Sequence, residues 1–540
     1  MREPSDAVLA DLVRRRAEER PERDVLTFEH WSLDGGATPD EVRSYAELAT
    51  HANRIAAGLI ARGLEPGQRF GLMMRNHPEF VETMIAASIT GGVFVPIDPR
   101  TRGDKLAFFL RRAGCRGIVC GDDCLEAVGA VRGELPDLRW ILTVASGEGP
   151  GADGAALPGV EPLAALLERE APTVDVRLAS AEDPLQIIFT SGTTGDPKGV
   201  VFPNARFGGF AMLGALLGYG PDERPYTGLS LTHGNAQAVT LGPALGMGAR
   251  AVFSRRFTKS KLWDVCRRYG CTTFSMLGGM ATAIYSEPPR PDDADNPVRF
   301  VVSAGMPAAI WESFERRFDV RVFEWYGAVE GGLAFKPVGE GPIGSFGRPA
   351  PGLEMRILDD EGRECPPGVV GEICSRPAGG GTPRVEYDGN AEASARKTAG
   401  GWLHSGDMGW RDEDGWLFFS HRRGGGIRRN GDFVNPGFVE KAVAELPEVD
   451  DVFVYGVPAA SGAPGEQDVV AAVVPAPGAT LSPEAVFRAC EKTLEKNFVP
   501  SWIQVVDEIP KTASEKPQAR LLQQRFAPGV PGVHAREEAA

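Results

Sequence analysis

Residues 190–200 combine hydroxyl groups, glycines and a lysine in a pattern that could hold phosphate. The stretch reads Thr190-Ser191-Gly192-Thr193-Thr194-Gly195-Asp196-Pro197-Lys198-Gly199-Val200 and follows an apolar run at 185–189 that is typical of a strand. Glycines allow successive backbone N–H groups to point at an anion, and the hydroxyl groups and the Lys198 ammonium add donors and positive charge. The stretch therefore predicts a loop for a triphosphate, with a flexible surface loop of the same composition as the alternative.

The spacing of this loop differs from that of the common P-loop. A Walker A sequence places lysine directly after its second glycine, whereas here Asp196 and Pro197 separate Gly195 from Lys198. The sequence therefore argues against an ordinary P-loop nucleoside triphosphatase.

Four further blocks along the chain carry residue types suited to nucleotide chemistry. They are Tyr326-Gly327-Ala328-Val329-Glu330, Gly401-Trp402-Leu403-His404-Ser405-Gly406-Asp407, the segment 421–431, and Pro510-Lys511-Thr512-Ala513-Ser514-Glu515-Lys516. With the glycine-rich loop they resemble, in type and order, the blocks of the adenylate-forming superfamily of acyl-CoA synthetases, nonribosomal peptide adenylation domains and beetle luciferases. The resemblance extends over nearly the whole chain.

The resemblance implies a reaction in two halves. A carboxylate attacks the α-phosphate of ATP to give acyl-AMP and pyrophosphate, and the thiol of coenzyme A then displaces AMP. The implied cofactors are ATP or AMP, coenzyme A and Mg²⁺, and the implied partners are a small carboxylic acid or its acyl-adenylate. Positioned cations must stabilise charge at the phosphorus centre. Lys516 stands at the position of the family's catalytic lysine, with a solvated surface lysine as the alternative.

The resemblance also assigns residues to the nucleotide. Asp407 would accept hydrogen bonds from the ribose hydroxyls, Arg422 would lie near ribose or phosphate, and Tyr326 would stack on adenine. A turn-forming aspartate and a core tyrosine are the alternatives. The residues assigned to ATP or AMP are Thr190, Ser191, Gly192, Thr193, Thr194, Lys198, Ala304, Gly305, Met306, Tyr326, Gly327, Asp407 and Arg422.

Further assignments concern the metal, the acyl group and coenzyme A. Glu330 matches the family's magnesium-linked glutamate, as expected for a hard cation that prefers carboxylate oxygens. His233 stands where family members place an aromatic residue beside the acyl site. We predict that Glu330 and His233 are both catalytic. A structural histidine is the alternative for His233. Arg428, Arg429 and Gly431 match the border of the pantetheine channel, where arginines suit the CoA phosphates. A solvated basic patch is the alternative.

Three positions depart from the family's pattern, and all concern the adenylating half. Val329 replaces a threonine whose hydroxyl reaches the α-phosphate, and such a hydrogen bond is worth roughly 1.5 to 3 kcal/mol. Glu515 replaces a glycine beside the catalytic lysine, and its carboxylate would repel the triphosphate by roughly 1 to 4 kcal/mol at about 4 Å. Gly424 replaces an aspartate or lysine at the pivot. These departures indicate weakened adenylation and a ligase that acts mainly on preformed acyl-AMP from a separate adenylating enzyme.

Composition bounds the class of protein. The 540 residues are 42% hydrophobic and 24% charged with a formal net charge of -15, which indicates a globular chain of two or three domains and argues against a nucleic-acid partner. The apolar run at 207–220 is too short for a membrane span and predicts a buried helix. Eight cysteines without a regular framework predict reduced thiols in a cytoplasmic protein; Cys115, Cys120 and Cys124 form a weak zinc candidate.

Apolar runs set the elements that must position these residues. Four runs alternate with helical patterns at 69–74, 92–97, 117–120 and 140–144, and a second set lies at 249–253, 300–303 and 320–323. This rhythm predicts parallel βαβ units. Between 344 and 420 short alternating strands with turn residues predict a β-rich subdomain.

The predicted fold is α/β. We expect a large N-terminal domain (1–421) of two βαβ subdomains plus a β-rich subdomain, followed by a small mobile α+β domain (427–540). The residues at 422–426 contain three consecutive glycines and predict the hinge between them, with a passive linker as the alternative.

The predicted function is that of an acid–thiol ligase forming a CoA thioester of an apolar carboxylic acid. Small residues on the helix expected beside the acyl pocket indicate a bulky acid, with tight helix packing as the alternative; they are Gly208, Gly209, Ala211, Gly214 and Ala215. One alternative is a stand-alone adenylation enzyme that loads a carrier protein. Another is a catalytically impaired protein that binds acyl-AMP or CoA thioesters, against which the retained catalytic-position lysine argues.

Overall fold

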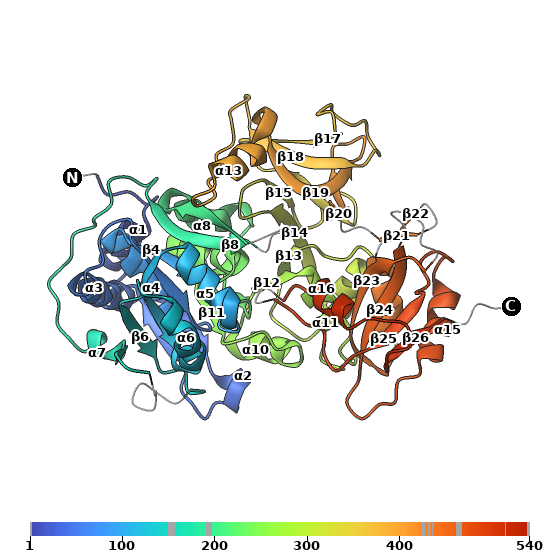
Figure 1. Ribbon diagram of the computed structural model, residues 1–540, viewed down its shortest axis with the longest axis horizontal. Coiled ribbons are helices and arrows are strands. Elements are labelled where there is room, and N and C mark those ends of the chain that lie inside the picture. The colour runs from blue at the N-terminus through green and yellow to red at the C-terminus, as the bar shows by residue number, and fades with distance from the viewer. Residues whose placement is uncertain are drawn as a thin grey trace. The chain divides into compact units, whose positions relative to one another are not determined.

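The computed structural model describes residues 3–149, 157–190, 197–423, 427–429, 432–434, 436–460, 467–512 and 515–536 (Figure 1). The chain divides into two units. The first contains Met1–Thr258, Asp264–Ser275 and Arg384–Arg396, and the second contains Lys259–Trp263, Met276–Pro383 and Lys397–Ala540.

A mostly parallel sheet in the first unit is formed by the predicted βαβ units. Its strand order is β7-β6-β5-β3-β4-β8-β9, in which β7 comprises Val160–Pro162. Strand β3 (Arg69–Met73) runs parallel to both β4 (Val93–Pro96) and β5 (Cys115–Gly121). Helix α4 (Pro78–Thr90) connects β3 to β4. It begins with proline in its first turn and ends at Gly91 in the left-handed conformation, a typical pair of helix boundaries.

The predicted phosphate loop lies between two paired strands of this sheet. Strand β8 (Pro184–Thr190) is antiparallel to β9 (Lys198–Pro203), and Thr190 is the register partner of Lys198. Strand β6 (Trp140–Val144) completes the set of apolar runs that the sequence predicted as strands.

A second sheet region of the first unit places β1 (Asp24–Glu29) between β2 (Glu41–Ser44) and β11 (Ala251–Ser254). The helices of this unit include, besides α4, α1 (Leu9–Glu19), α3 (Tyr45–Ala61), α5 (Gly103–Arg112), α6 (Leu125–Val131), α8 (Asn204–Leu216) and α9 (Gly242–Met247).

The prediction of a buried helix at 207–220 was right about the helix and only half right about burial. Helix α8 leaves Met212 64% and Leu216 49% exposed. Its opposite face is packed closely, since a Cβ on Gly208 would lie 2.6 Å from Ala7 Cα and one on Gly214 would lie 2.5 Å from Met247 Sδ. Close packing against these neighbours explains why both positions are glycine without invoking the size of a substrate.

The second unit contains the predicted β-rich region. Strands β13 and β14 are parallel, and the strands after them pair antiparallel in the order β14-β15-β16-β20-β19-β18-β17. Their bounds are β13 (Phe300–Ala304), β14 (Arg321–Gly327), β15 (Leu333–Lys336), β16 (Ser345–Pro349), β17 (Leu353–Leu358), β18 (Gly371–Pro377), β19 (Leu403–Arg411) and β20 (Leu417–Arg422). Phe346, Ile357, Ile373 and Leu417 form a buried core among these strands.

The C-terminal segment forms its own small sheet, coloured orange to red in Figure 1. In the described residues its four strands are β23 (Val449–Pro458), β24 (Gln467–Pro475), β25 (Trp502–Val505) and β26 (Val533–Ala535). Helices α14 (Pro436–Ala444) and α15 (Pro483–Thr493) cover a core that includes Val439, Ala471 and Phe487.

The predicted fold is confirmed: a large N-terminal α/β domain precedes a small C-terminal domain with a four-stranded sheet in the described residues. The boundaries at 421 and 427 and the mobility of the small domain stay predictions, and residues 424–426 of the expected hinge lie outside the described residues. Across the described part of the chain, every helix is too short or too polar to cross a membrane.

Candidate functional site

Asp407 lies where two other predicted nucleotide residues meet. The Oη atom of Tyr326, on β14, donates a hydrogen bond of 2.7 Å to Oδ2 of Asp407, and Nε of Arg422, on β20, donates one of 3.0 Å to Oδ1. Arg422 is also the register partner of Asp407 in the β19–β20 ladder. A carboxylate oxygen can accept two hydrogen bonds, so this carboxylate retains the capacity to bind a pair of hydroxyls.

Tyr326 is held on two sides. Its ring stacks on Phe346 with centroids 4.6 Å apart, and its phenol contacts Asp407. Burial, and then the charge of Asp407, raise the pKa of Tyr326 well above its ordinary value, so the phenol keeps its proton and remains the donor. Tyr326 lines a pocket together with Glu330, Lys397 and Ser405.

The predicted adenine segment 304–306 is anchored by a residue that the sequence analysis missed. Glu324, buried on β14, accepts hydrogen bonds from the backbone N–H groups of Gly305 at 2.5 Å and Met306 at 3.2 Å. Burial raises the pKa of Glu324 to about 8, against the opposing effect of these donors. Ala304 ends β13, and Gly305 then turns with a φ of +95°. An acidic residue within an otherwise apolar strand run was the available signal.

The charges of Arg422 and Asp407 both act on the Lys516 ammonium. Its loop is closed by the hydrogen bond from Thr512 N to Lys516 O at 2.8 Å and by a bridge between Lys511 and Pro517. The Lys516 side chain is exposed along part of its length, but surrounding protein atoms partly desolvate its ammonium group. Desolvation, and then the positive charge of Arg422, lower its pKa, whereas Asp407 acts in the opposite direction. The residue at the catalytic-lysine position is therefore within electrostatic range of the predicted ribose carboxylate.

The residue before Lys516 has an unusual backbone conformation. Glu515 has a φ of 56°, in the left-handed region that glycine occupies without strain. Its carbonyl oxygen would lie 3.3 Å from a Cβ placed on Gly279, so the loop also packs closely against the start of α11 (Gly278–Tyr285). A glycine at position 515 would fit this turn better than glutamate does.

Three predicted site residues, Thr190, Lys198 and His233, lie in the described part of the first unit. Thr190 Oγ1 donates a 3.4 Å hydrogen bond to the carbonyl oxygen of Lys198, whose ammonium lies 5.5 Å from the centroid of the Tyr387 ring. His233 Nδ1 accepts a hydrogen bond of 3.2 Å from Asn235 N. The remaining predicted loop residues lie outside the described residues: Ser191, Gly192, Thr193 and Thr194.

The structure also describes Glu330, Gly327 and Arg429 of the second unit. Glu330 lies in a turn closed by reciprocal backbone hydrogen bonds between Ala328 and Gly331, of 3.2 and 3.1 Å. Gly327 ends β14. The Arg429 guanidinium donates to the backbone carbonyls of Val499 and, at 3.4 Å, Asn497, which is a structural role in the small domain. The side chain of Arg428 and the whole of Gly431 lie outside the described parts of the chain, so the predicted CoA channel stays a prediction.

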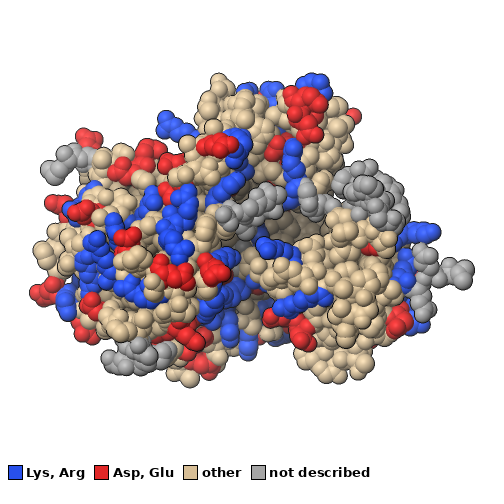
Figure 2. All heavy atoms as spheres, in the orientation of Figure 1, with Lys and Arg blue, Asp and Glu red and all other residues tan. Residues whose placement is uncertain are grey.

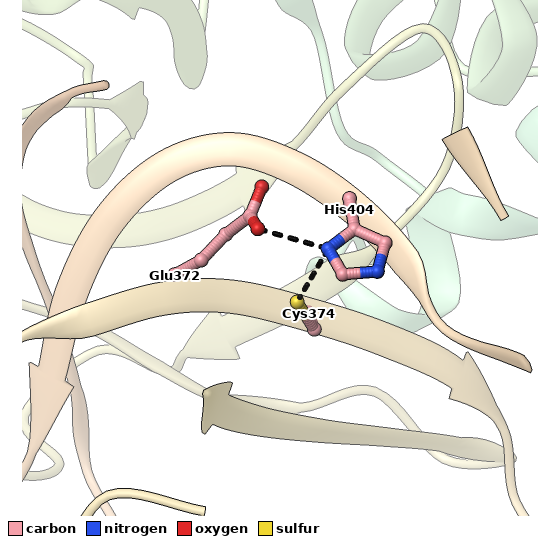
Figure 3. Close-up of side chains that lie close together, drawn as sticks. All are labelled: Glu372, Cys374 and His404. Carbon is pink, nitrogen blue, oxygen red and sulfur yellow. Dashed lines mark hydrogen bonds and ion pairs between the residues drawn. The ribbon is translucent and has the colours of Figure 1, made fainter. Parts of the chain in front are cut away.

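A cluster of Glu372, Cys374 and His404 was not predicted (Figure 3). His404 Nδ1 lies 2.8 Å from Glu372 Oε2 and 3.5 Å from Cys374 Sγ, while Nε2 lies 3.2 Å from the carbonyl oxygen of Ala399. The three side chains have ligand atoms within 4.8 Å of one another, as a metal site would. However, both Glu372 oxygens already accept hydrogen bonds from the protein, and burial together with Glu372 raises the pKa of the Cys374 thiol to about 12. We therefore interpret the cluster as a hydrogen-bonded group.

The weak zinc candidate is not supported. Cys115, Cys120 and Cys124 are buried free thiols whose pKa values are raised by burial, and within the described residues the three do not form a group of metal-ligand geometry. All eight cysteines of the chain are buried and free, as the sequence predicted.

The surface carries both signs of charge. On the face shown in Figure 2, many Lys and Arg side chains lie beside Asp and Glu, although the chain has a formal net charge of -15. An acidic protein can thus present local positive charge to a phosphate-bearing molecule.

Sequence comparison finds relatives over most of the chain. The AMP-binding enzyme family matches residues 13–380, and the AMP-binding enzyme C-terminal domain matches residues 439–516. A medium/long-chain-fatty-acid–CoA ligase, FadD17, of Mycobacterium tuberculosis is 32% identical over 89% of this chain and 92% of its own length. A crotonobetaine/carnitine–CoA ligase of Salmonella paratyphi A is 30% identical over 88% of this chain and 91% of its own length.

Solved structures share the fold. The anthranilate CoA ligase AuaEII in complex with anthranoyl-AMP matches with a TM-score of 0.81 and 24% identity, covering 96% of each chain. A benzoate CoA ligase of Burkholderia xenovorans matches with a TM-score of 0.78 and 22% identity, covering 95% of this chain and 99% of its own.

Proposed function

Because the chain belongs to the AMP-binding enzyme family, we propose that it is an AMP-forming acyl-CoA ligase that activates a carboxylic acid as acyl-AMP and transfers the acyl group to coenzyme A. The observation that carries this proposal is that the charges of Asp407 and its hydrogen-bonded partner Arg422 both act on the Lys516 ammonium. A lysine cation within electrostatic range of a carboxylate suited to ribose can stabilise the charge that develops at the α-phosphate during adenylation.

The described residues divide the work of the first half-reaction. Asp407 binds the ribose hydroxyls, while Tyr326 fixes that carboxylate and stacks on the adenine base. Glu324 holds the backbone of Gly305 and Met306 in place for adenine. Lys516 supplies positive charge to the phosphate and to the attacking carboxylate. Glu330 lines the same pocket as Tyr326 and would hold Mg²⁺, which neutralises phosphate charge when bound.

We further propose that adenylation is the weaker half-reaction. Val329 offers no hydroxyl to the α-phosphate, and Glu515 adds a negative charge next to Lys516. The φ of 56° at Glu515 adds a conformational effect, because a non-glycine residue is strained there and the loop must keep this shape to present the lysine. In this proposal the enzyme works best on acyl-AMP supplied by a separate adenylating enzyme, as a thioesterifying ligase.

The acid that we propose has a bulky apolar body. The names of the relatives include fatty-acid, anthranilate and benzoate CoA ligases, whose acids are largely apolar, although crotonobetaine and carnitine are not. Two of the small residues on α8 have packing roles, so support for a bulky acid comes from the relatives and not from that helix.

A panel of acids tests the proposal. Medium-chain and long-chain fatty acids, benzoate, anthranilate and carnitine would each be incubated with ATP and coenzyme A, and with the corresponding synthetic acyl-AMP and coenzyme A. We expect a CoA thioester from at least one apolar acid, and faster formation from its acyl-AMP. Tight binding of acyl-AMP without any transfer to coenzyme A, across the panel, would contradict the proposed ligase.

A further inference from the structure

The turn that carries Asp407 is a bulge in strand β19. Glu372 on β18 pairs with Met408 of β19, but Cys374, two residues further on, pairs with His404, four residues back. The segment 405–407 is therefore longer than the strand opposite it and bulges from the ladder. Bulges redirect side chains and are frequent beside active sites. Something must hold this bulge in a single shape if Asp407 is to meet a ribose.

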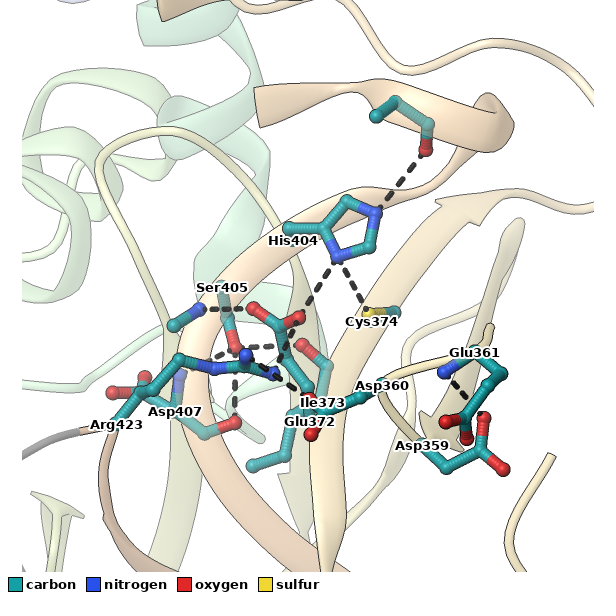
Figure 4. A network of polar contacts seen from close by, with 12 residues as sticks. Asp359, Asp360, Glu361, Glu372, Ile373, Cys374, His404, Ser405, Asp407 and Arg423 are labelled. Atoms are coloured by element: carbon teal, nitrogen blue, oxygen red, sulfur yellow. Dashed lines mark hydrogen bonds and ion pairs between the residues drawn. The ribbon is translucent and has the colours of Figure 1, made fainter. Parts of the chain in front are cut away.

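Glu372 occupies the position that holds the bulge (Figure 4). Its Oε1 accepts a 2.8 Å hydrogen bond from the backbone N of Gly406, while its Oε2 pairs with His404 Nδ1 at 2.8 Å and with Arg423 Nη2 at 3.4 Å. The backbone N of Arg423 in turn donates a 2.9 Å hydrogen bond to Gly406 O. The N–H group of Gly406 is thus fixed directly by Glu372. The carbonyl group of Gly406 is fixed by Arg423, which itself pairs with Glu372.

Gly406 needs such support. Its φ of +80° is a conformation that glycine adopts freely but does not prefer over others, so the residue adds freedom at the centre of the bulge. Glu372 is only 8% exposed, which means that its hydrogen bonds face little competition from water. If the Glu372 carboxylate were removed, little water could reach this site to take over its hydrogen bonds to Gly406, His404 and Arg423.

We propose that Glu372 is a positioning residue for nucleotide binding. It orients Asp407 through Gly406, and it orients Arg422 through the neighbouring Arg423, so that both partners of the nucleotide site depend on one buried carboxylate. The inference rests on the proposed function, because it assumes that Asp407 binds ribose. It extends that function to a residue which touches neither the nucleotide nor the acyl group.

The fold itself has other support at this place. Ser405 Oγ donates a 2.6 Å hydrogen bond to Ile373 O, and Asp407 N donates one of 2.9 Å to Ser405 Oγ. The β17–β18 ladder and most of the β18–β19 ladder do not involve the Glu372 side chain. We therefore expect Glu372→Gln, which keeps the shape and one acceptor oxygen, to fold.

Two neighbouring residues provide matched controls. Cys374 contacts the same histidine at 3.5 Å but makes no hydrogen bond to the bulge in the described contacts, and Asp360 pairs with the same Arg423 at 3.2 Å from an exposed position. Cys374→Ser and Asp360→Asn therefore disturb the partners of Glu372 without removing its contact with Gly406.

The test measures AMP affinity by calorimetry and melting temperature for the full chain. We expect Glu372→Gln to weaken AMP binding about tenfold and Glu372→Ala to weaken it further, with both controls within about twofold of the parent protein. Glu372→Ala should also raise KM for ATP more than it lowers kcat, which a general loss of folded protein would not do.

Two results would overturn the inference. If both Glu372 variants bound AMP like the parent protein, or if Cys374→Ser or Asp360→Asn weakened binding as much as Glu372→Gln, the carboxylate would not be the positioning group. Failure of the parent protein itself to bind AMP would be distinct, because it would remove the proposed function along with the inference.

Discussion

The phenol of Tyr326 donates a 2.7 Å hydrogen bond to the carboxylate of Asp407 and so joins strand β14 to strand β19. The residue predicted to stack on adenine therefore also fixes the residue predicted to bind ribose. Because burial raises the pKa of Tyr326, the phenol remains a donor throughout the physiological pH range.

Removing this hydrogen bond should weaken nucleotide binding. In Tyr326→Phe the ring can still stack on Phe346, but Asp407 loses a donor, and a hydrogen bond to a charged group is worth roughly 1.5 to 3 kcal/mol. We expect a roughly tenfold or greater loss of AMP affinity by calorimetry, and a larger loss for Asp407→Ala. Unchanged affinity in Asp407→Ala would remove the ribose assignment.

Replacing Glu515 with glycine should relieve backbone strain in the loop that carries Lys516 and should raise the rate of adenylation. Glu515→Gly relieves the φ of 56° and removes a negative charge, whereas Glu515→Ala removes only the charge. We expect acid-dependent pyrophosphate release to rise in both variants, and to rise further in the glycine variant.

Asp319 provides the control for backbone strain. It is the other non-glycine residue with positive φ in the described residues, at 49°, and it ends helix α12 (Trp311–Phe318). Asp319→Gly should raise the melting temperature by up to a few degrees without changing pyrophosphate release. An equal rise in that rate for Asp319→Gly would show that general stability, and not the lysine loop, limits adenylation.

The pH dependence of adenylation should report Lys516. Desolvation and Arg422 lower its pKa from 10.5, so the cation is lost at a lower pH than for an ordinary lysine. Pyrophosphate release should therefore fall on the alkaline side with a midpoint below pH 10.5. Thioester formation from supplied acyl-AMP should lack this limb and should be barely affected by Lys516→Ala. The same alkaline limb in both half-reactions would assign it to another group.

Stability should depend on pH through Glu324. Its pKa is raised from 4.5 to about 8, so the folded protein holds a proton that the unfolded chain releases. This contribution to stability is full below about pH 4.5 and is lost as pH rises through about 8. Glu324→Gln does not titrate there, so its melting temperature relative to the parent protein should increase by a few degrees between pH 5 and pH 9. Glu361→Gln, at an exposed position, is the control for the general effect of removing one carboxylate.

The sequence predicted the strands, the order of the domains and most of the residues around Asp407, because apolar periodicity and block order are local signals. It could not predict that Glu324 and Glu372 hold the backbone of the site, since their roles arise from hydrogen bonds between segments distant in sequence. It also attributed the departure at Glu515 to charge alone, because only the structure shows the left-handed turn. For Gly208 and Gly214 the sequence left a wide acyl pocket and tight packing as alternatives, and the close approach of neighbouring atoms supports packing.

The most direct test compares the two half-reactions of the parent protein on one acid. The acid that gives the most thioester in the panel would be used to measure acid-dependent pyrophosphate release with ATP, and CoA thioester formation from its purified acyl-AMP, at the same enzyme concentration. The account predicts that pyrophosphate release is slower by at least about tenfold, because Val329 and Glu515 weaken adenylation only. Comparable fast rates in both would contradict it and would show an ordinary two-step ligase in which these substitutions are neutral.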